Sequence, residues 1–414
     1  MNTVSKDTEV LVIGASLAGL VAATEAAKGG ARTLLVDAAP EIGGRANPAN
    51  VIMEPLWPTR TVDIPEQAVT RDYEGVEVAG PSGTGPIFRF RAVHVDRRQF
   101  DSIFAQNARD AGAQTQGNVS VRAVTPPNNG GNVQVHTDDG TLEAPVVIFA
   151  DGAGSTVQQA MTTMKNPKDV SWGLDQLLEA PGLGESPFFH VRFGSFAPGW
   201  RVQLNPLGGD RANLWTFRRG GSKDELDDLS HRARKLFPAA EHAQVLDEAR
   251  GADPAFVAPA RIASDGLLAC GAAAGQGGLE NGAYAGFLAG TTAAKALKAG
   301  DVSSEGLSEY QRAWRKKVVA ELIALKYGIS SLRHLSDHEI DTVFASLAGE
   351  EFSDEQFKAV LRGNPTSLMQ RVGPRTTAGL LLTVGKGWVK EAATSTATSL
   401  TRNGFSAAGS SPKT

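Results

Sequence analysis

The chain has 414 residues, of which 41% are hydrophobic and 21% charged, and its formal net charge at pH 7 is -4. This composition is that of an ordinary globular protein with two domains or one large α/β domain, and the charge gives no electrostatic basis for a nucleic-acid partner. The single cysteine, Cys270, excludes an internal disulfide and any multi-cysteine metal or iron–sulfur site, so no metal centre is expected.

The opening of the chain predicts a strand, a glycine turn, a helix and a second strand. "EVLVIG" is a short apolar run, Leu17 to Lys28 is alanine-rich, and "RTLLVD" ends at Asp37. Gly14, Ser16 and Gly19 stand at G-x-G-x-x-G spacing, with serine in place of the middle glycine. In this arrangement a helix N-terminus faces a pyrophosphate, and the acid after the second strand binds ribose hydroxyls. The motif predicts an adenine dinucleotide site and does not by itself separate FAD from NAD.

The rest of the chain alternates between helices and hairpins. Asp96 to Gly112 is expected to be a helix, because Phe100, Ile103, Phe104 and Ala108 fall on one face. "DDG" at 138–140 and "GGD" at 208–210 predict hairpin turns. The remaining expected elements are a buried strand "PVVIFA", a strand, glycine turn and helix over 265–300, a mainly helical segment over 304–348 and a frayed polar tail.

Membrane spanning and secretion are not expected. Met1 to Thr8 is polar and no run of about 20 apolar residues follows, so the expected location is the cytoplasm. Thr376 to Lys390 holds an apolar cluster with one tryptophan and flanking lysines. Such a helix packs on the protein body or rests on a membrane surface. Packing on the body is the preferred alternative, and peripheral membrane contact stays open.

Three blocks resemble the flavoprotein hydroxylases and their relatives. "VVIFADGAGSTVQQ" resembles their D-G fingerprint, with Asp151 and Gly152 as the pair, and "GLLACGAAAGQGGLENGAYAGFLAG" resembles their third motif. Arg97 matches the arginine that precedes a Phe-Asp pair in the same group. The blocks occur in the family's order. The resemblance implies that the cofactor is FAD rather than NAD.

The third motif departs from the family at one position. Ala272 stands where the family has an aspartate that contacts flavin oxygens, while neighbouring glycines leave the backbone free to approach a ligand. "EIGGRA" also resembles the amine-oxidase branch, which leaves Arg45 either beside the pyrophosphate or on a surface loop. Cys270 is expected to be a small buried residue. The residues expected to hold FAD are Gly14, Ser16, Gly19, Asp37, Arg45, Arg97, Asp151, Gly152, Ala272, Gly275 and Gly282.

Within this group, the chain most resembles the geranylgeranyl reductases and their relatives related to electron-transfer-flavoprotein dehydrogenases. The resemblance rests on the helix with Arg97, the hairpin "PGWRVQLNPLGGDRANLWTF" and the later "LSEYQRAWRKKV". It implies a Rossmann-like α/β FAD domain of the glutathione-reductase and p-hydroxybenzoate-hydroxylase type. The expected division is an FAD domain over 1–170 and 255–300 with substrate-domain strands inserted at about 47–92, a β-sheet substrate domain over 171–254, a helical region over 301–390 and a flexible tail over 391–414.

The hairpin departs from the family where it forms the substrate tunnel. Arg201, Gln203 and Asn205 occupy the places of three tunnel aromatics, and alternation puts them on one face of the strand, opposite Trp200, Val202 and Leu204. This predicts a polar substrate wall with a positive charge, suited to an anionic or hydrogen-bonding group. The inverted facing, with the polar set in solvent, stays open.

The resemblance implies reduction of a carbon–carbon double bond of an isoprenoid or related small molecule or lipid, with hydride leaving flavin N5. Flavin-dependent hydroxylation of a polar or anionic substrate and a degenerate flavin fold that only binds a partner are the alternatives. The sequence does not identify the external electron donor, for which NAD(P)H and a reduced carrier protein are the alternatives. The segment directly after the ribose acid, "GGRANPANVIMEP", has no cysteine to deliver a proton. His94, Tyr284 and Glu280 are possible proton donors, and a structural or solvent-facing role is the preferred alternative for each.

Overall fold

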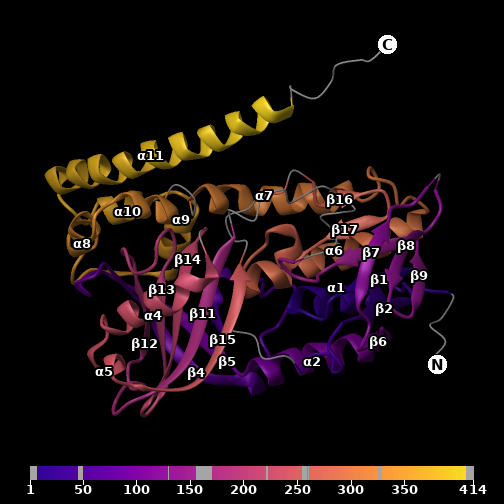
Figure 1. The fold of residues 1–414 in the computed structure, drawn as a ribbon, viewed down its shortest axis with the longest axis horizontal. Coiled ribbons are helices and arrows are strands. Elements are labelled where there is room, and N and C mark those ends of the chain that lie inside the picture. Colours follow the sequence, from indigo (N-terminus) through magenta and orange to yellow (C-terminus); the bar gives the residue numbers. More distant parts are fainter. Residues whose placement is uncertain are drawn as a thin grey trace.

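The protein is described here by a computed structural model that covers residues 7–44, 50–128, 130–154, 170–220, 222–253, 259, 261–324 and 328–406. Two lobes lie side by side, each organised around a large sheet, and helices from the C-terminal part of the chain run across the top of both (Figure 1).

The first lobe contains a six-stranded sheet in the order β16-β17-β10-β1-β2-β6. The strands β17, β10, β1, β2 and β6 are parallel, and only the edge strand β16 runs antiparallel to its neighbour. All four residues of β1, β2 and β10 are buried, as expected for parallel strands covered on both faces. This confirms the predicted Rossmann-like α/β core. Its strands are β1 (Val10–Ile13), β2 (Thr33–Val36), β6 (Gln114–Gln116), β10 (Val146–Phe149), β16 (Ala263–Ser264) and β17 (Leu267–Ala269).

Three helices, α1 (Leu17–Lys28), α2 (Arg97–Asp110) and α6 (Leu279–Ala299), pack in this lobe. The predicted apolar face of α2 is present, since Phe100, Phe104 and Ala108 are buried. Helices α1 and α6 approach closely because Gly286 and Gly290 of α6 face the backbone carbonyls of Ala18 and Ala22. A small antiparallel sheet, with the predicted hairpin between its last two strands, completes the lobe: β7 (Val121–Thr125), β8 (Val133–Thr137) and β9 (Gly140–Ala144).

The second lobe contains a nine-stranded sheet in the order β15-β11-β14-β13-β12-β4-β5-β18, with β3 paired to β5. The predicted hairpin at 208–210 joins β13 to β14. The short strand β18 was not expected; it comes from the C-terminal part of the chain and pairs with β5. The strands are β3 (Val51–Met53), β4 (Val69–Ala79), β5 (Ile87–Val95), β11 (Ser171–Glu179), β12 (Phe188–Arg192), β13 (Val202–Gly208), β14 (Arg211–Arg219), β15 (Gln244–Asp253) and β18 (Glu351–Phe352).

The two faces of this sheet have different partners. On one face, Val202 and Leu204 of β13 join a core with Phe237 and residues of α4 (Leu226–Arg234) and α5 (Pro238–Glu241). On the other face, Trp215 of β14 belongs to a core with Phe189 and the C-terminal helices. Strand alternation therefore gives β13 two faces. Its apolar face packs against α4 and α5, and its other face lies on the side of the sheet that carries Trp215.

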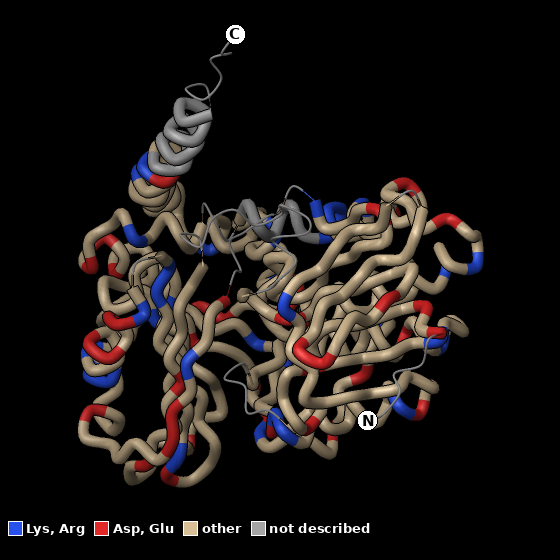
Figure 2. Tube along the Cα trace, turned by 45° about the vertical axis from the view of Figure 1, so that its right-hand side comes forward, with Lys and Arg blue, Asp and Glu red and all other residues tan. Residues whose placement is uncertain are grey.

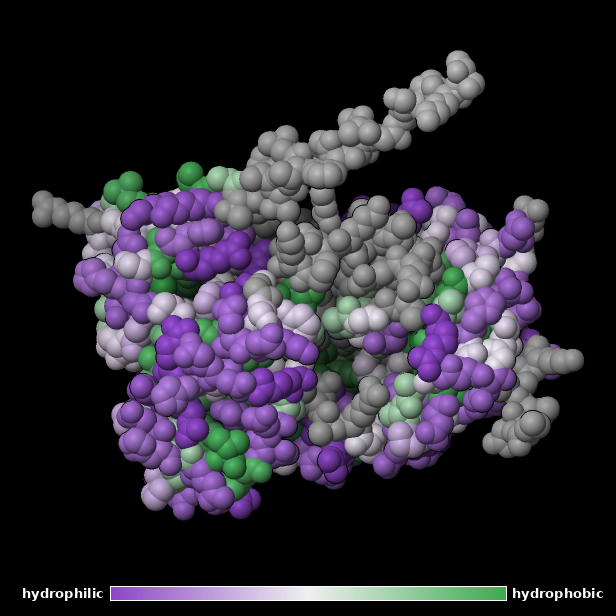
Figure 3. Space-filling view, viewed as in Figure 1, coloured by the Kyte–Doolittle hydropathy of each residue, from purple (hydrophilic) through white to green (hydrophobic). Residues whose placement is uncertain are grey.

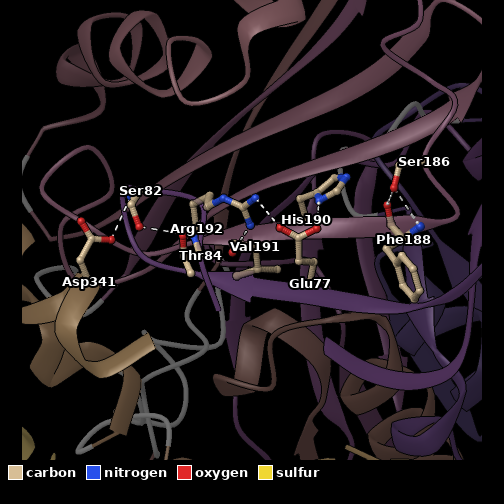
Figure 4. A network of polar contacts seen from close by, with 9 residues as sticks. All are labelled: Glu77, Ser82, Thr84, Ser186, Phe188, His190, Val191, Arg192 and Asp341. Atoms are coloured by element: carbon tan, nitrogen blue, oxygen red, sulfur yellow. Dashed lines mark hydrogen bonds and ion pairs between the residues drawn. The ribbon is translucent and has the colours of Figure 1, made fainter. Parts of the chain in front are cut away.

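A half-buried ion cluster of Glu77, His190 and Arg192 lies on the α4/α5 face (Figure 4). Glu77 Oε1 lies 2.8 Å from Arg192 Nη2, and Glu77 Oε2 lies 3.2 Å from His190 Nδ1. The hydrogen bond from His190 is the main cause that holds the pKa of Glu77 down to about 2. Because each charge in this cluster has a partner, it serves the packing of the sheet. The loop after β4 is tied to the C-terminal region by Ser82 N, which donates to Asp341 Oδ1.

The C-terminal region is helical, as predicted, and its last helix runs over the top of the molecule (Figure 1). Glu391 of that helix is fully buried and forms ion pairs with Arg219, Arg333 and His334. The helix continues to Ser406 and so includes much of the segment expected to be a flexible tail. Among the described residues, no helix is long and apolar enough to cross a membrane. The helices are α7 (Ser308–Ala324), α8 (Asp337–Ala345), α9 (Asp354–Leu361), α10 (Thr366–Met369) and α11 (Pro374–Ser406), and the short 3-10 turns are η1 (Glu54–Leu56), η2 (Glu66–Ala68), η4 (Lys223–Glu225), η5 (Gly271–Ala274) and η7 (Ser330–His334).

Candidate functional site

The first glycine turn connects β1 to α1 and lies against the end of β10. Gly14 has φ +102°, and a Cβ there would lie 2.5 Å from the carbonyl oxygen of Ala150, so only glycine fits without strain. A Cβ on Gly19 would lie 2.0 Å from the carbonyl oxygen of Gly14. Ser16, the residue in place of the middle glycine, donates from its hydroxyl to the Ala150 carbonyl at 3.0 Å. The serine therefore links the first turn to the segment that carries the D-G pair.

Asp37 lies directly beside this turn. One of its carboxylate oxygens accepts a hydrogen bond from Ala15 N and the other from Ala39 N, both at 2.7 Å. These bonds fix the carboxylate at the end of β2, and a carboxylate with two oxygens has further acceptor positions for ribose hydroxyls. The geometry is thus the one that the sequence predicts for a ribose-binding acid.

The third glycine turn meets the same helix. A Cβ on Gly271 would lie 2.8 Å from Ala18 Cβ, and one on Gly282 would lie 3.8 Å from it. Gln276, which sequence reasoning missed, holds the turn by accepting from Gly271 N at 2.8 Å and donating to Tyr310 Oη at 3.1 Å. The three glycine-bearing segments, far apart in sequence, therefore converge around the start of α1.

The residues at this convergence fit FAD. Helix α1 begins there without a side chain capping its first turn, so its N–H groups and positive dipole end are available to a pyrophosphate. Helix α6 begins there as well, with the Glu280 carboxyl in its first turn. Gly152 has φ +91°, and no atom of the described residues lies within 4 Å of a Cβ position there. Ala272 is half-buried in η5 and offers no acceptor there. Asp151 is the carboxylate nearest in sequence to the open position at Gly152.

The contacts among the described residues do not assign the two predicted arginines, Arg97 and Arg45, to the glycine turns. Arg97 begins α2 and is buried, and its Nη2 pairs with Asp101 Oδ2 at 2.8 Å in the next turn. Burial is the main cause that raises the pKa of Asp101, and Arg97 opposes it. A role of Arg97 toward FAD stays a prediction. Arg45 lies outside the described residues.

Cys270 is fully buried at the end of β17. Burial raises the pKa of its thiol, and the nearby charge of Asp151 raises it further. The side chain is therefore a thiol at neutral pH rather than a reactive thiolate, in line with the expected structural role.

On the substrate side, Arg201, Gln203 and Asn205 form one hydrogen-bonded strip. Arg201 Nε donates to Gln203 Oε1 at 3.0 Å, and Gln203 Nε2 donates to Asn205 Oδ1 at 2.8 Å. Gln203 is 3% and Asn205 0% exposed, so the polar set is buried and the inverted facing, with this set in solvent, is not observed. Among the described residues Asn205 Nδ2 has no hydrogen-bond partner. The strip thus ends on a buried donor that a ligand acceptor could satisfy.

The first residue of the strip faces the junction between the lobes. The guanidinium of Arg201 lies 4.2 Å from the ring centre of Trp200 and 5.4 Å from that of Phe217. Burial lowers its pKa to about 10, against the opposing charges of Asp253 and Glu280. Glu280, in the first turn of α6, accepts from Met53 N at 3.0 Å, and burial raises its pKa. The Arg201 end of the polar strip therefore lies near the first turn of α6, which we expect to border the FAD site.

A second buried polar group on this face was missed by sequence reasoning. Asn213 Nδ2 donates to Asp175 Oδ1 at 2.8 Å, and Asp175 pairs across the strands with Trp215, which in turn pairs with Gln203. Burial raises the pKa of Asp175 to about 7. The only available signal was an acid within the otherwise apolar strand "SWGLDQLLE", whose partner lies on another strand.

The predicted proton donors differ in their surroundings. Burial lowers the pKa of His94 to about 4, so its imidazole is neutral at pH 7, and its Nδ1 lies 2.6 Å from Thr70 Oγ1. Tyr284 is half-buried, with Lys317 Nζ 4.2 Å from its ring centre.

Figure 3 shows that the visible face is mostly hydrophilic, with apolar residues in the hollow between the lobes.

The family model and the similar curated proteins indicate an FAD-dependent oxidoreductase. A family model described as FAD dependent oxidoreductase matches residues 9–176. Two digeranylgeranylglycerophospholipid reductases of Methanothermobacter thermautotrophicus are similar to the chain: reductase 1 is 29% identical, covering 92% of this chain and 98% of the relative, and reductase 2 is 30% identical, covering 86% and 95%. A solved structure, a geranylgeranyl bacteriochlorophyll reductase-like protein from Thermoplasma acidophilum, superposes with a TM-score of 0.77 at 19% identity, covering 90% of this chain and 95% of that one, which shows a shared fold.

Proposed function

Because the chain belongs to the digeranylgeranylglycerophospholipid reductase family of FAD-dependent oxidoreductases, we propose that it reduces a carbon–carbon double bond in the prenyl chain of a lipid with an anionic or hydrogen-bonding group. Relatives named as reductases favour reduction over hydroxylation and over a fold that only binds a partner. FAD, when bound, supplies the hydride-transfer chemistry.

The buried strip of Arg201, Gln203 and Asn205 carries the substrate proposal. The two carboxamides are buried and Arg201 is half-buried, and the three side chains hydrogen-bond to one another, but Asn205 Nδ2 has no partner among the described residues. A purely hydrocarbon substrate would leave this donor of Asn205 unsatisfied. A substrate with a phosphate, hydroxyl or carbonyl oxygen beside the reacting bond satisfies it. Trp215 lies across the hairpin from Gln203, and Phe217 lies across it from Arg201. We assign to these two rings the apolar contact with the prenyl chain of the substrate.

Addition of hydrogen across a double bond also needs a proton, and we assign its storage to Asp175. The carboxyl is buried on the same sheet face as Gln203, and its pKa of about 7 leaves it substantially protonated at neutral pH. His94, with a pKa of about 4, carries no such proton at pH 7. Asn213 holds the Asp175 carboxyl in place.

The test is an anaerobic half-reaction. Chemically reduced holoenzyme is mixed with a prenylated glycerophospholipid or with the matching neutral prenyl alcohol, and flavin reoxidation and product mass are followed. Reoxidation with a product heavier by two hydrogens for each reduced bond supports the proposal. Oxygen-dependent turnover that yields a hydroxylated product, with no anaerobic reoxidation, would contradict it.

Arg201→Gln separates the substrate proposal from the reaction type. Loss of the charge-assisted contact is expected to raise KM for the phospholipid by about 10–100-fold, with little change for the neutral alcohol. Arg211→Gln is the matched control, because Arg211 lies in the same hairpin with an exposed side chain paired to Glu179. If Arg201→Gln raises KM equally for the phospholipid and the neutral alcohol, the polar strip does not recognise the anionic group of the substrate.

We further propose that α11 makes peripheral membrane contact, which would bring the enzyme to a lipid substrate. Leu382 and Val389 of α11 are 77% and 71% exposed, and Leu381 and Trp388 lie beside them. A helix with exposed apolar side chains and lysines suits a membrane surface. Co-sedimentation with anionic phospholipid vesicles is expected to fall in the double variant Leu382→Gln/Val389→Gln, and unchanged sedimentation would contradict the contact.

A further inference from the structure

A second polar cavity lies away from the flavin and substrate groups, between the edge strand β16 and the start of α7. Its volume is about 210 Å³. The lining residues are Arg261, Ala263, Ser304, Ser308, Gln311, Arg312 and Arg315. Three guanidinium groups thus gather around one small cavity in a chain whose net charge is negative.

Acidic side chains lie near this cavity but are not part of its lining. Among the described residues, neither Arg261 nor Arg312 forms a salt bridge, whereas most other arginines with a described environment pair with a carboxylate. Glu309 of the same helix lies 3.4 Å from Lys295. Asp265 accepts from the backbone N and hydroxyl of Ser304, and Arg261 contributes to lowering its pKa. The lining therefore holds three exposed arginines and no acidic side chain, and Asp265 offsets part of the charge of Arg261.

Three guanidinium groups around one cavity favour an anionic ligand, and phosphate in particular. Arginine presents planar forks of N–H donors that match phosphate oxygens, and convergence of like charges is unfavourable until an anion joins them. Helix α7 begins at Ser308 on the cavity wall, so its positive dipole end adds to the field. Figure 2 shows Lys and Arg positions gathered on this part of the molecule.

The size of the cavity limits what it encloses. Its volume of about 210 Å³ is below the roughly 300–1,000 Å³ of pockets that enclose a whole small-molecule ligand. A phosphate group fits, and the rest of a larger ligand would lie outside. The opposite side of α7 carries Tyr310, which donates to Ala269 O at 2.6 Å and contacts Gln276 of the third glycine turn. The occupant would therefore sit one helix away from the flavin turn.

We propose that the cavity lined by Arg261, Arg312 and Arg315 is a binding site for a phosphate group, separate from the FAD phosphates and from the substrate strip. The phosphate is free, part of a phosphorylated nucleotide reductant, or part of a glycerophosphate headgroup. The site goes beyond the proposed reaction and does not depend on it.

The test is calorimetric titration of the FAD-loaded protein with inorganic phosphate at low ionic strength. Arg261→Gln and Arg312→Gln are each expected to weaken phosphate binding by about tenfold or more. Arg109→Gln, an exposed arginine at the end of α2, is the matched control and is expected to bind as the wild type does. Flavin absorbance and the melting temperature verify that each variant is folded and loaded.

Competition then identifies the source of the phosphate. Displacement by NADPH but not by NADH indicates a nucleotide 2′-phosphate, displacement by glycerol 1-phosphate indicates a lipid headgroup, and displacement by neither indicates free phosphate. The site is refuted if the loaded wild-type protein shows no saturable phosphate binding, or if Arg261→Gln and Arg312→Gln bind phosphate as tightly as Arg109→Gln. Failure of the reductase assay with intact phosphate binding would leave this site standing.

Discussion

Substitution of single α6 glycines by alanine tests how the flavin lobe is packed. Gly286→Ala places a Cβ 2.3 Å from the backbone carbonyl oxygen of Ala18, while Gly282→Ala, one turn earlier on the same helix, places it 3.8 Å from Ala18 Cβ, an ordinary contact. Both changes gain about 1 kcal/mol of helix propensity. Only Gly286→Ala forces α1 and α6 apart, because a backbone carbonyl cannot rotate away as a side chain can.

The magnitudes follow from these distances. Overpacking costs about 1–3 kcal/mol, and a backbone obstacle belongs at the upper end. After the gain in propensity, Gly286→Ala is expected to lose about 1–2 kcal/mol, whereas Gly282→Ala is expected to be neutral or up to about 1 kcal/mol more stable. At about 2–4 °C per kcal/mol, the melting temperatures move in opposite directions by a few degrees.

The assay is thermal unfolding followed by circular dichroism on protein freed of FAD, so that flavin affinity does not enter the comparison. The two variants differ only in the position of one methyl group on one helix. If Gly286→Ala melts at or above the temperature of Gly282→Ala, the close approach of α1 and α6 at the flavin turn is not as described.

The remaining predictions concern the flavin turn and the buried acid. Asp37→Ala is expected to lower flavin retention on purification, while Asp63→Ala, at an exposed position, retains it; equal absorbance ratios would contradict the ribose role. Ser16→Gly is expected to keep FAD, because glycine is the usual residue there, and to lose about 0.5–1.5 kcal/mol of stability with the bond to the Ala150 carbonyl; chemical denaturation measures the loss, and release of FAD would show that the hydroxyl binds the cofactor. Burial raises the pKa of Asp175 from 3.8 to about 7, so the folded state binds its proton more tightly, and its contribution to stability is present below about pH 4 and lost as pH rises to 7. Asp175→Asn is therefore expected to gain stability relative to the wild type over that range, by at most about 4 kcal/mol; taking the difference between the two proteins cancels His94, whose pKa of about 4 gives the opposite slope, and a difference independent of pH would refute the buried-acid assignment.

Much of the flavin lobe could be predicted from the sequence because its requirements are local. Gly14 and Gly152 adopt positive φ values that other residues rarely take. Gly14 directly follows the short apolar strand β1, and Gly152 follows β10 after Ala150 and Asp151. Such turns leave a recognisable pattern of residue types at fixed spacing. The order of the three motifs along the chain then sufficed to predict FAD and a Rossmann-like core.

The choice of faces and partners was decided by tertiary structure. Alternation separated Arg201, Gln203 and Asn205 from Val202 and Leu204, but only the packing of the apolar pair against α4 and α5 settled which set is turned away from those helices. A strand pattern has two equivalent faces, and nothing within the strand distinguishes them.

The same holds for contacts between distant segments. Asp175 finds Asn213 through the register of two strands, and Glu280 reaches Met53 across the junction of the lobes. The arginine-lined cavity likewise joins Arg261, before β16, to Arg312 on α7. The sequence by itself determined the local backbone turns that hold a flavin. Only the folded chain determined which charges meet, because burial and the distances between charges depend on residues that are remote in sequence.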